Sequence, residues 1–257
     1  MAESGEAVRV FVRLKPTRPR ARAEPATPTR SCSATKGAAR ETAQSHSAGK
    51  HSCRPAPVPA LFAKESETCL LNARTGEPLC FDGVFSPKED NQRVFARAVQ
   101  PQLPALLGGT SLAVFMYGQT NSGKTFTMKG DGQPGLLQLA LRALFALAEA
   151  QTALLVRARL SYVEVYNEKV FDLLNEGCAL ELREREGALQ LGAREVVVAE
   201  EEAALRAWAE GERLRHVAAT SSNARSSRSH VLLLLALDLR ERSRLTEQRR
   251  VQLLLAD

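Results

Sequence analysis

Residues Gly118 to Thr125 read G-Q-T-N-S-G-K-T, which is a complete G-x-x-x-x-G-K-[ST] phosphate loop. The two glycines allow the backbone to turn tightly, so that successive N–H groups point at phosphate oxygens. Lys124 is then expected to reach the β- and γ-phosphates, and the hydroxyl of Thr125 to ligate Mg²⁺. The pattern predicts a site for a nucleoside triphosphate; the alternative is a glycine-rich surface turn.

The segments on either side of this loop have the character that the site requires. A phosphate loop needs a strand before it and a helix after it, so that the phosphates lie at a positive helix terminus. Leu112–Met116 is an apolar run with the length of a buried strand. Thr125–Met128 can begin a helix, which Gly130 and Gly132 are expected to end early.

The bulk properties describe a chain without a membrane segment. Its 257 residues are enough for one sizeable core, and 44% hydrophobic residues is ordinary for a globular protein. No apolar run approaches the roughly 20 residues that span a bilayer. The N-terminus lacks the basic-then-apolar layout of a secretory signal. We therefore expect an intracellular protein with no membrane partner.

The cysteines give no disulfide or metal pattern. They are odd in number and irregularly spaced, which argues against a disulfide framework and fits a reducing compartment. The five are Cys32, Cys53, Cys69, Cys80 and Cys178. Cys32 and Cys53 could form a zinc site with His46 and His51, but there is no C-x-x-C. Unpaired residues in a flexible segment are the favoured interpretation, so no metal beyond Mg²⁺ is expected.

The net charge of +6 belongs to one segment. Residues 17–60 hold eight Lys or Arg residues and two acids, and they contain no aromatic residue. Such a stretch cannot bury enough apolar surface to offset its ordering entropy. We predict one domain over residues 1–257 in which 17–66 is a basic, disordered insertion. An electrostatic tether to an acidic polymer and an inert spacer are equally good roles for it.

The rest of the chain alternates between strand and helix patterns. Strands are predicted over 8–14, 78–85, 154–165, 231–239 and 251–255. Three helices are predicted. The first starts at Asn91, a fair N-cap, and breaks or bends near Pro101 and Pro104; the second covers Leu137–Ala148; and the third covers Glu201–Leu214 around Trp208. This order predicts an α/β fold: a three-layer sandwich of the P-loop NTPase type, whose central, mostly parallel or mixed sheet is flanked by helices. Asp257 follows the last strand, as a Walker-B carboxylate does near Mg²⁺.

Several further blocks resemble the kinesin motor domain. Tyr117–Met128 resembles the family's phosphate-loop signature Y-G-Q-T-x-[SA]-G-K-T-[YF]-T-M. Residues 223–230 match its switch I pattern N-x-x-S-S-R-S-H at every defined position. Residues 161–168 and 172–174 resemble its S-Y-x-E-I-Y-N-E and D-L-L segments, and 81–85 its F-D-x-V-F turn. Residues 13–16 resemble its R-x-R-P, with Lys15 in place of the second Arg.

The resemblance implies a role for each matching position. ATP would be held by Lys124 and by the loop, whose members are Gly118, Gln119, Thr120, Asn121, Ser122, Gly123, Lys124 and Thr125. The adenine side would be formed by Arg13, Pro16 and Tyr117. Mg²⁺ would be ligated by Thr125 and Ser227, with Asp257 nearby. The γ-phosphate would be sensed, and the attacking water placed, by Asn223, Ser226 and Ser227. Arg228 would pair with a switch II glutamate.

The chain also departs from the family pattern. Gly109–Leu112 replaces an aromatic residue and an Asn-Gly pair, and the insertion is longer than the family's excursion there. Asp257 matches the first residue of D-L-A-G-S-E, so the resemblance stops at the start of switch II. From this we expect no microtubule-stimulated ATPase from these 257 residues alone.

Three functions follow from these patterns. The leading one is a microtubule-based motor of the cytoplasmic cytoskeleton, an ATPase that hydrolyses ATP with Mg²⁺ and has tubulin as its partner. The F-V-R-L-K-P opening favours ciliary or flagellar kinesins, and other segments equally favour spindle kinesins. The first alternative is a catalytically impaired kinesin-like binding module without switch II. The second is a nucleic-acid translocase, which the lack of aromatics among the basic residues disfavours.

Overall fold

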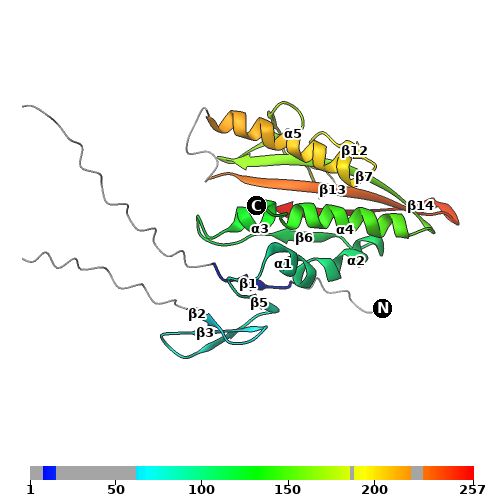
Figure 1. Ribbon diagram of the computed structural model, residues 1–257. Helices are drawn as coiled ribbons and strands as arrows, with labels where there is room; N and C mark the ends of the chain where they lie inside the picture. Colours follow the sequence, from blue (N-terminus) through cyan, green and yellow to red (C-terminus); the bar gives the residue numbers. More distant parts are fainter. Residues whose placement is uncertain (1–7, 16–61, 186–187, 221–227) are drawn as a thin grey trace, which may run out of the picture.

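The computed structural model describes residues 8–15, 62–185, 188–220 and 228–257 (Figure 1). Its helices are α1 (Asn91–Ala98), the 3₁₀ turn η1 (Gln100–Gln102), α2 (Leu103–Leu107), α3 (Lys124–Lys129), α4 (Leu136–Ala150) and α5 (Glu201–Thr220). The strands before α4 are β1 (Phe11–Arg13), β2 (Phe62–Lys64), β3 (Cys69–Asn72), β4 (Pro78–Cys80), β5 (Gly83–Phe85) and β6 (Leu112–Phe115). The later strands are β7 (Leu154–Tyr166), β8 (Lys169–Asp172), β9 (Cys178–Leu180), β10 (Arg183–Arg185), β11 (Ala188–Gln190), β12 (Val196–Val198), β13 (His230–Glu241) and β14 (Arg244–Ala256).

A seven-stranded sheet forms the centre of the molecule. Six strands follow the order β6-β14-β13-β7-β8-β9, and β12 pairs with residues 158–160 of β7, on the same edge as β8. β6 and β14 run parallel, whereas the other pairings of this sheet are antiparallel. The prediction of a mixed sheet is confirmed, and β6–β14 is its one parallel pair among the described residues. That pair places the strand before the phosphate loop beside the strand that leads to Asp257.

The core lies on one face of this sheet. Leu235 of β13 pairs with Leu160 of β7 and with Leu253 of β14, and all three are fully buried. Because side chains alternate along a strand, Leu233 and Leu237 fall on the same face, where they are also buried. Each fully buried leucine contributes about 1.5–3 kcal/mol of hydrophobic stabilisation.

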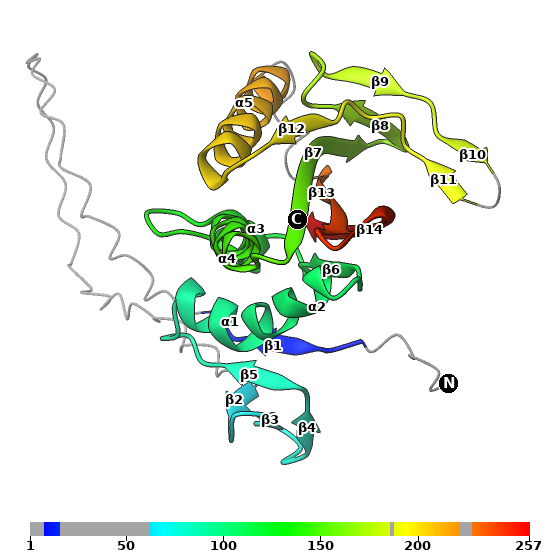
Figure 2. The same ribbon diagram turned by 90° about the vertical axis from the view of Figure 1, so that its right-hand side faces the viewer.

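Helices cover that apolar face. In Figure 2, α3, α4 and α5 lie together on one side of the sheet, with α1 and α2 below them. α4 buries Leu137, Leu141 and Leu144, which recur at helical spacing as the sequence predicts. The helices of the described residues lie on this side of the sheet. The α/β architecture is therefore confirmed, with one layer of helices packed on the central sheet.

Two smaller sheets join the N-terminal strands to α1. β1 pairs in parallel with β5, and β2, β3 and β4 form an antiparallel sheet. A disulfide joins Cys69 to Cys80 across β3 and β4, so the prediction of unpaired cysteines is wrong for this pair, because the antiparallel register brings them opposite each other. Cys178 is a free, exposed thiol.

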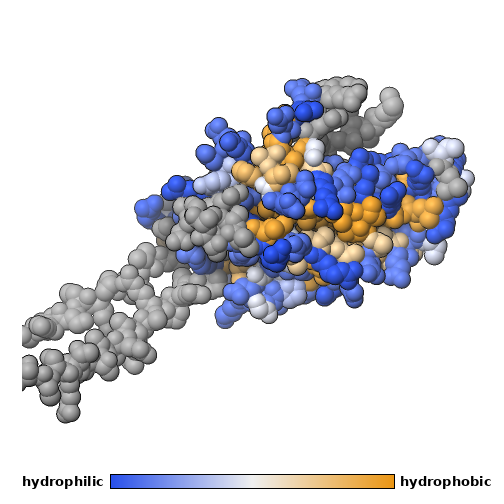
Figure 3. Space-filling model, turned by 90° about the horizontal axis from the view of Figure 1, so that it is seen from above, coloured by the Kyte–Doolittle hydropathy of each residue, from blue (hydrophilic) through white to orange (hydrophobic). Residues whose placement is uncertain are grey.

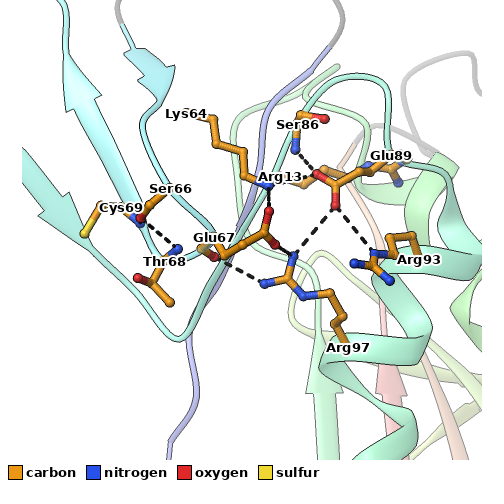
Figure 4. A network of polar contacts seen from close by, with 10 residues as sticks. All are labelled: Arg13, Lys64, Ser66, Glu67, Thr68, Cys69, Ser86, Glu89, Arg93 and Arg97. Carbon is orange, nitrogen blue, oxygen red and sulfur yellow. Dashed lines mark hydrogen bonds and ion pairs between the residues drawn. The ribbon is translucent and has the colours of Figure 1, made fainter.

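A cluster of charged side chains attaches the three-stranded sheet to α1 (Figure 4). Glu89 accepts hydrogen bonds from the Ser86 N–H at 2.5 Å and from Lys64 Nζ at 3.2 Å. Arg97 of α1 pairs with Glu67 and lies over the ring of Phe85 at 5.0 Å. Hydrogen bonding to Ser86 and Lys64 outweighs burial and holds the pKa of Glu89 below its ordinary value.

Two predicted boundaries need correction. Phe62–Lys64 forms β2 and pairs with β3, so residues 62–66 at the end of the predicted insertion are ordered. Residues 17–61, together with the proposed Cys and His group, lie outside the described residues. The N-cap of α1 is Asp90, whose side chain accepts from the Arg93 N–H at 2.8 Å. Asn91 is instead the first helical residue and is fully buried.

One face of the molecule is mostly hydrophilic but not uniformly so. In the view of Figure 3, a band of hydrophobic residues crosses a face that is otherwise rich in hydrophilic ones. Large side chains that remain exposed include Phe115, Val197 and Leu182. Within the described part of the chain, no helix is both long and apolar enough to cross a membrane.

Candidate functional site

The phosphate loop joins β6 to α3, as its sequence predicts. β6 ends at Phe115 and α3 begins at Lys124. Between them the backbone is left-handed at Gly118 (φ 150°), Asn121 (φ 64°) and Gly123 (φ 102°). A Cβ on Gly118 would lie 2.8 Å from Ser122 Oγ, so this position has no room for another side chain. Repeated left-handed residues turn the N–H groups to the inside of the curl, which makes an anion-binding concavity.

Lys124 folds back over the loop. Its Nζ donates to the carbonyl oxygens of Gly118 at 2.8 Å and Gln119 at 2.9 Å. The ammonium group therefore lies against the curl of the loop, where phosphate oxygens are expected. Phosphate oxygens can replace the two loop carbonyls as its hydrogen-bond acceptors. Thr125, the next residue, is exposed.

Asp257 lies beside the entrance to the loop. Its N–H donates to the Val231 carbonyl and its carbonyl accepts from the Val231 N–H, both at 3.0 Å. On the other side of the same strand end, the Met116 N–H donates to the Ala256 carbonyl at 3.0 Å. Asp257 thus follows β14 at the edge where β6 runs into the loop, which is the place predicted for a Walker-B carboxylate.

These residues fit a nucleoside triphosphate with Mg²⁺. The left-handed curl offers N–H groups, Lys124 offers a cation, and Thr125 and Asp257 offer the hard oxygen ligands that Mg²⁺ prefers. Lys124 and the loop would hold the phosphates, and Thr125 and Asp257 would lie near the metal. Bound Mg²⁺ would neutralise charge that develops on the phosphate oxygens.

Arg13 faces the helix that follows the loop. Its guanidinium donates to Asn91 Oδ1 at 2.5 Å, to Thr127 Oγ1 at 2.8 Å and to the Glu89 carbonyl at 2.9 Å. It also lies 5.2 Å from the centre of the Phe126 ring. Burial lowers the pKa of Arg13. Arg13 therefore ties β1 to α1 and α3, and its proposed place beside the adenine stays a prediction.

Two residues that sequence reasoning did not assign also support the loop. Asn91 donates to the carbonyls of Phe126 at 3.0 Å and Pro134 at 3.2 Å while accepting from Arg13. Lys15 Nζ donates to the Asn121 carbonyl within the loop at 2.5 Å. For Lys15, the sequence did offer a signal, because this lysine replaces the second Arg of the family's R-x-R-P pattern. Nothing local in the sequence marks Asn91, because its partners are distant along the chain.

The remaining predicted site residues are placed only in part. Tyr117, proposed for the adenine side, is 97% exposed at the start of the loop. Arg228 is exposed in the turn before β13. Pro16, Asn223, Ser226 and Ser227 lie outside the described residues. Their proposed roles in adenine, metal and γ-phosphate contacts stay predictions.

Comparison with known proteins places this geometry in a family. The family model described as "Kinesin motor domain" matches residues 17–257. Kinesin-like protein KIN-7M, chloroplastic, of Arabidopsis thaliana is 39% identical over 161 residues, 62% of this chain and 15% of that protein. Kinesin-like protein KIN-7G of Oryza sativa subsp. japonica is 34% identical over 192 residues, 74% of this chain and 21% of that protein. The chain thus spans about a fifth or less of the length of these relatives.

A solved structure shows the same fold. The structure described as that of a fast kinesin matches with a TM-score of 0.71 and 24% sequence identity, covering 77% of this chain and 58% of that one. The family match covers most of the chain, and it agrees with the phosphate loop between β6 and α3 and with the mixed sheet. The chain belongs to the kinesin motor domain family.

Proposed function

We propose that this chain is the nucleotide-binding part of an ATP-driven, microtubule-based motor. The observation that carries the proposal is the phosphate loop itself: left-handed Gly118, Asn121 and Gly123 form the curl, and Lys124 Nζ lies over it within 2.9 Å of two loop carbonyls. Asp257 at the end of the neighbouring parallel strand supplies a carboxylate at the same edge of the sheet. The family supplies tubulin as the polymer.

Hydrolysis of ATP at this site would need little covalent catalysis from the protein. Phosphoryl transfer depends on positioning and on stabilising negative charge. Lys124 and the loop N–H groups hold the phosphates, while Arg13 and Asn91 hold α3 in place behind them. Asn223, Ser226 and Ser227 would place the attacking water, and Thr125 and Ser227 would ligate Mg²⁺. ATP, Mg²⁺ and a cytoskeletal location are therefore part of the proposal.

The impaired binding module is the less favoured function. A domain that no longer bound ATP would be free to lose the loop lysine and glycines, whereas this chain retains the whole pattern in the expected conformation. Tubulin is preferred to a nucleic acid as the polymer because the family match extends over the sheet and the helices, and not over the loop alone.

Microtubule pelleting tests the proposal. We expect the chain to pellet with microtubules to a different extent in a non-hydrolysable ATP analogue than in ADP. Lys124→Ala, which removes the ammonium group from the loop, is expected to pellet equally in both. Pelleting that is absent or indifferent to nucleotide in the wild type, or salt-sensitive DNA binding that exceeds it, would contradict the proposal.

A further inference from the structure

A buried ion pair joins the phosphate-loop helix to α5. Lys129, the last residue of α3, lies with its Nζ 2.7 Å from Oε1 of Glu212 on α5. The two side chains are only 9% and 16% exposed. The Tyr162 hydroxyl of β7 donates to the same carboxylate oxygen. Two helices and the central sheet therefore meet at one carboxylate, although none of these three residues belongs to the phosphate loop.

The position of α5 at this point is fixed by a close approach to the sheet. A Cβ added to Gly211 would lie 2.5 Å from Cδ1 of Tyr162, so the backbone of α5 rests directly on the tyrosine ring. Trp208 lies one turn earlier on α5, with its indole Nε1 buried. It is the only tryptophan of the chain. The fit leaves little room for α5, and Trp208 with it, to move without displacing Tyr162.

The same face of α5 has a second polar anchor. Arg215, about one turn after Glu212, donates to Glu164 Oε1 on β7 at 3.3 Å and to Ser229 Oγ at 3.1 Å. Glu164 is 1% exposed. Ser229 directly precedes β13. Contacts from this side of α5 thus reach α3, β7 and the start of β13.

The charges in this cluster depend on one another. Burial opposes the ionised form of Glu212, but attraction to Lys129 and hydrogen bonds from Lys129 and Tyr162 outweigh it, so the pKa of Glu212 lies below its ordinary value. Burial lowers the pKa of Lys129, and Glu212 and Asp257 offset part of that shift. Burial and the Glu212 charge raise the pKa of Tyr162, which keeps its hydroxyl proton available to donate. Removing one charge leaves the other buried without its partner, which is costly.

α3 is a short connection between the loop and this cluster. It begins at Lys124, which lies over the phosphate loop, and ends at Lys129, which holds Glu212. A helix of six residues is about 9 Å long, so its two ends move as one unit. A change in the position of Lys124 is therefore carried to Glu212, and through Glu212 to the part of α5 that holds Trp208.

We propose that Lys129 and Glu212 are positioning residues that couple occupancy of the phosphate loop to the packing of α5. The proposal rests on the nucleotide site proposed above and extends it to residues that touch no nucleotide. Nucleotide affinity and the environment of Trp208 are then linked quantities. Because linkage is reciprocal, breaking the pair changes both.

Trp208 provides a direct readout of the proposal in the wild-type chain. We expect its fluorescence, excited at the red edge of the tryptophan band, to change when the Mg²⁺ complex of ATP binds. Nucleotide binding itself is measured separately with a fluorescent ATP analogue. In Lys129→Met, which keeps most of the side-chain length but removes the charge, the nucleotide-dependent Trp208 change is expected to disappear. The variant's nucleotide affinity is expected to fall roughly fivefold or more, the usual lower range for coupled sites.

Two further variants separate coupling from simple loss of stability. Tyr162→Phe removes one hydroxyl and keeps the ring, and it is expected to reduce the nucleotide-dependent change in Trp208 fluorescence. This milder variant tests the proposal even where Lys129→Met does not fold. Asp238→Asn is the matched control, because it breaks the partly buried pair of Asp238 with Arg159 at 2.6 Å, away from α3 and α5. That variant is expected to lose stability but to keep the full Trp208 response.

The outcomes distinguish the two proposals. If the wild type binds no nucleotide, both the proposed function and this inference fail. If it binds nucleotide with no change at Trp208, or if Lys129→Met and Tyr162→Phe respond as the wild type does, the inference alone is overturned. A response lost equally in Asp238→Asn would also overturn it, because stability would then explain the effect.

Discussion

At the scale of single residues, the phosphate loop of the proposed nucleotide site depends on side chains that lie behind the helix that follows it. Asn91 is the clearest case: it is fully buried, donates to one carbonyl in α3 and to one in the α3–α4 connection, and accepts from Arg13. Its partners lie far apart in the sequence, so its removal affects several elements at once. When a buried amide is removed, its hydrogen-bond partners are left unsatisfied.

Substituting Asn91 by alanine is therefore expected to destabilise the chain. The loss should be about 1–3 kcal/mol, since the guanidinium of Arg13 and two carbonyls would be left without this partner. Chemical denaturation followed by circular dichroism measures it. Gln92→Ala, an exposed neighbour on the same helix, is the control and should change stability by less than about 0.5 kcal/mol. Equal effects in the two variants would contradict the role given to Asn91.

Glu212 gives a pH-dependent prediction. Its pKa is lower in the folded chain than in the unfolded chain, so its contribution to stability is present above its unfolded pKa of about 4.3 and is lost as the pH falls through the folded value. Between roughly pH 5 and pH 3 the wild type should lose more stability than Glu212→Gln, which cannot titrate there. Denaturation midpoints across this range measure the difference. Parallel pH profiles for the two proteins would show that Glu212 is not stabilised as its carboxylate.

At the scale of elements, the charged cluster around Glu89 decides how the three-stranded sheet is attached. Lys64 comes from β2, Glu67 from the turn before β3, and Arg97 from α1, and Glu89 lies between the first and the last of these. Few apolar contacts come from β4, whose residues are exposed. Leu70 of β3 is buried, and the Val84 N–H donates to the Glu67 carbonyl at 2.8 Å, so the charged cluster adds to apolar and backbone contacts. The charged part of the attachment should weaken at high salt.

Glu89→Gln tests this attachment. It keeps the shape of the side chain but removes the charge that faces Lys64 and Arg97, and we expect a loss of about 1–3 kcal/mol together with faster amide exchange in β2 and β3. Hydrogen exchange read by mass spectrometry locates the effect. The control is Glu77→Gln, at an exposed residue of the connection between β3 and β4. Exchange that rises across the whole chain, rather than in β2 and β3, would contradict a local attachment.

The sequence predicted the long elements better than the short ones. β7, β13 and α4 follow from their periodicity, because each buries one regular face against the core. β14 begins at Arg244, well before the predicted Val251, because pairing with β13 extends a strand whose polar residues gave no apolar signal. β8, β9 and β12 are short: β8 and β12 form because β7 offers them an edge, and β9 forms on the far edge of β8. Their positions cannot be deduced without the register along β7, and the Cys69–Cys80 disulfide cannot be deduced without the separate register of β3 and β4.

The site divides in the same way. The turn of the phosphate loop and the place of Asp257 after β14 could be predicted, because the pattern is local and its spacing is fixed. Asn91, Lys129 and Glu212 were not predictable, because each acts through a partner dozens of residues away. Arg13 was assigned to the adenine by resemblance, and its contacts with Asn91 and Thr127 became visible only in the fold.

At the scale of the whole molecule, the fold places the proposed nucleotide site at the end of the sheet where β6 and β14 run in parallel. α1 and β1 hold α3 from one side through Asn91 and Arg13, and α5 holds it from another through Glu212. The helices on the apolar face therefore support the loop as well as the core. Motor activity of this family member would depend on ATP binding at the loop.

Equilibrium binding of a fluorescent ATP analogue, with and without Mg²⁺, tests this claim most directly. We predict saturable binding at one site in the wild-type chain, weakened when Mg²⁺ is removed. In Lys124→Ala the affinity should fall by about tenfold or more, because a charge-assisted hydrogen bond contributes roughly 1.5–3 kcal/mol. Binding that is absent from the wild type, or equal in the wild type and Lys124→Ala, would contradict the account.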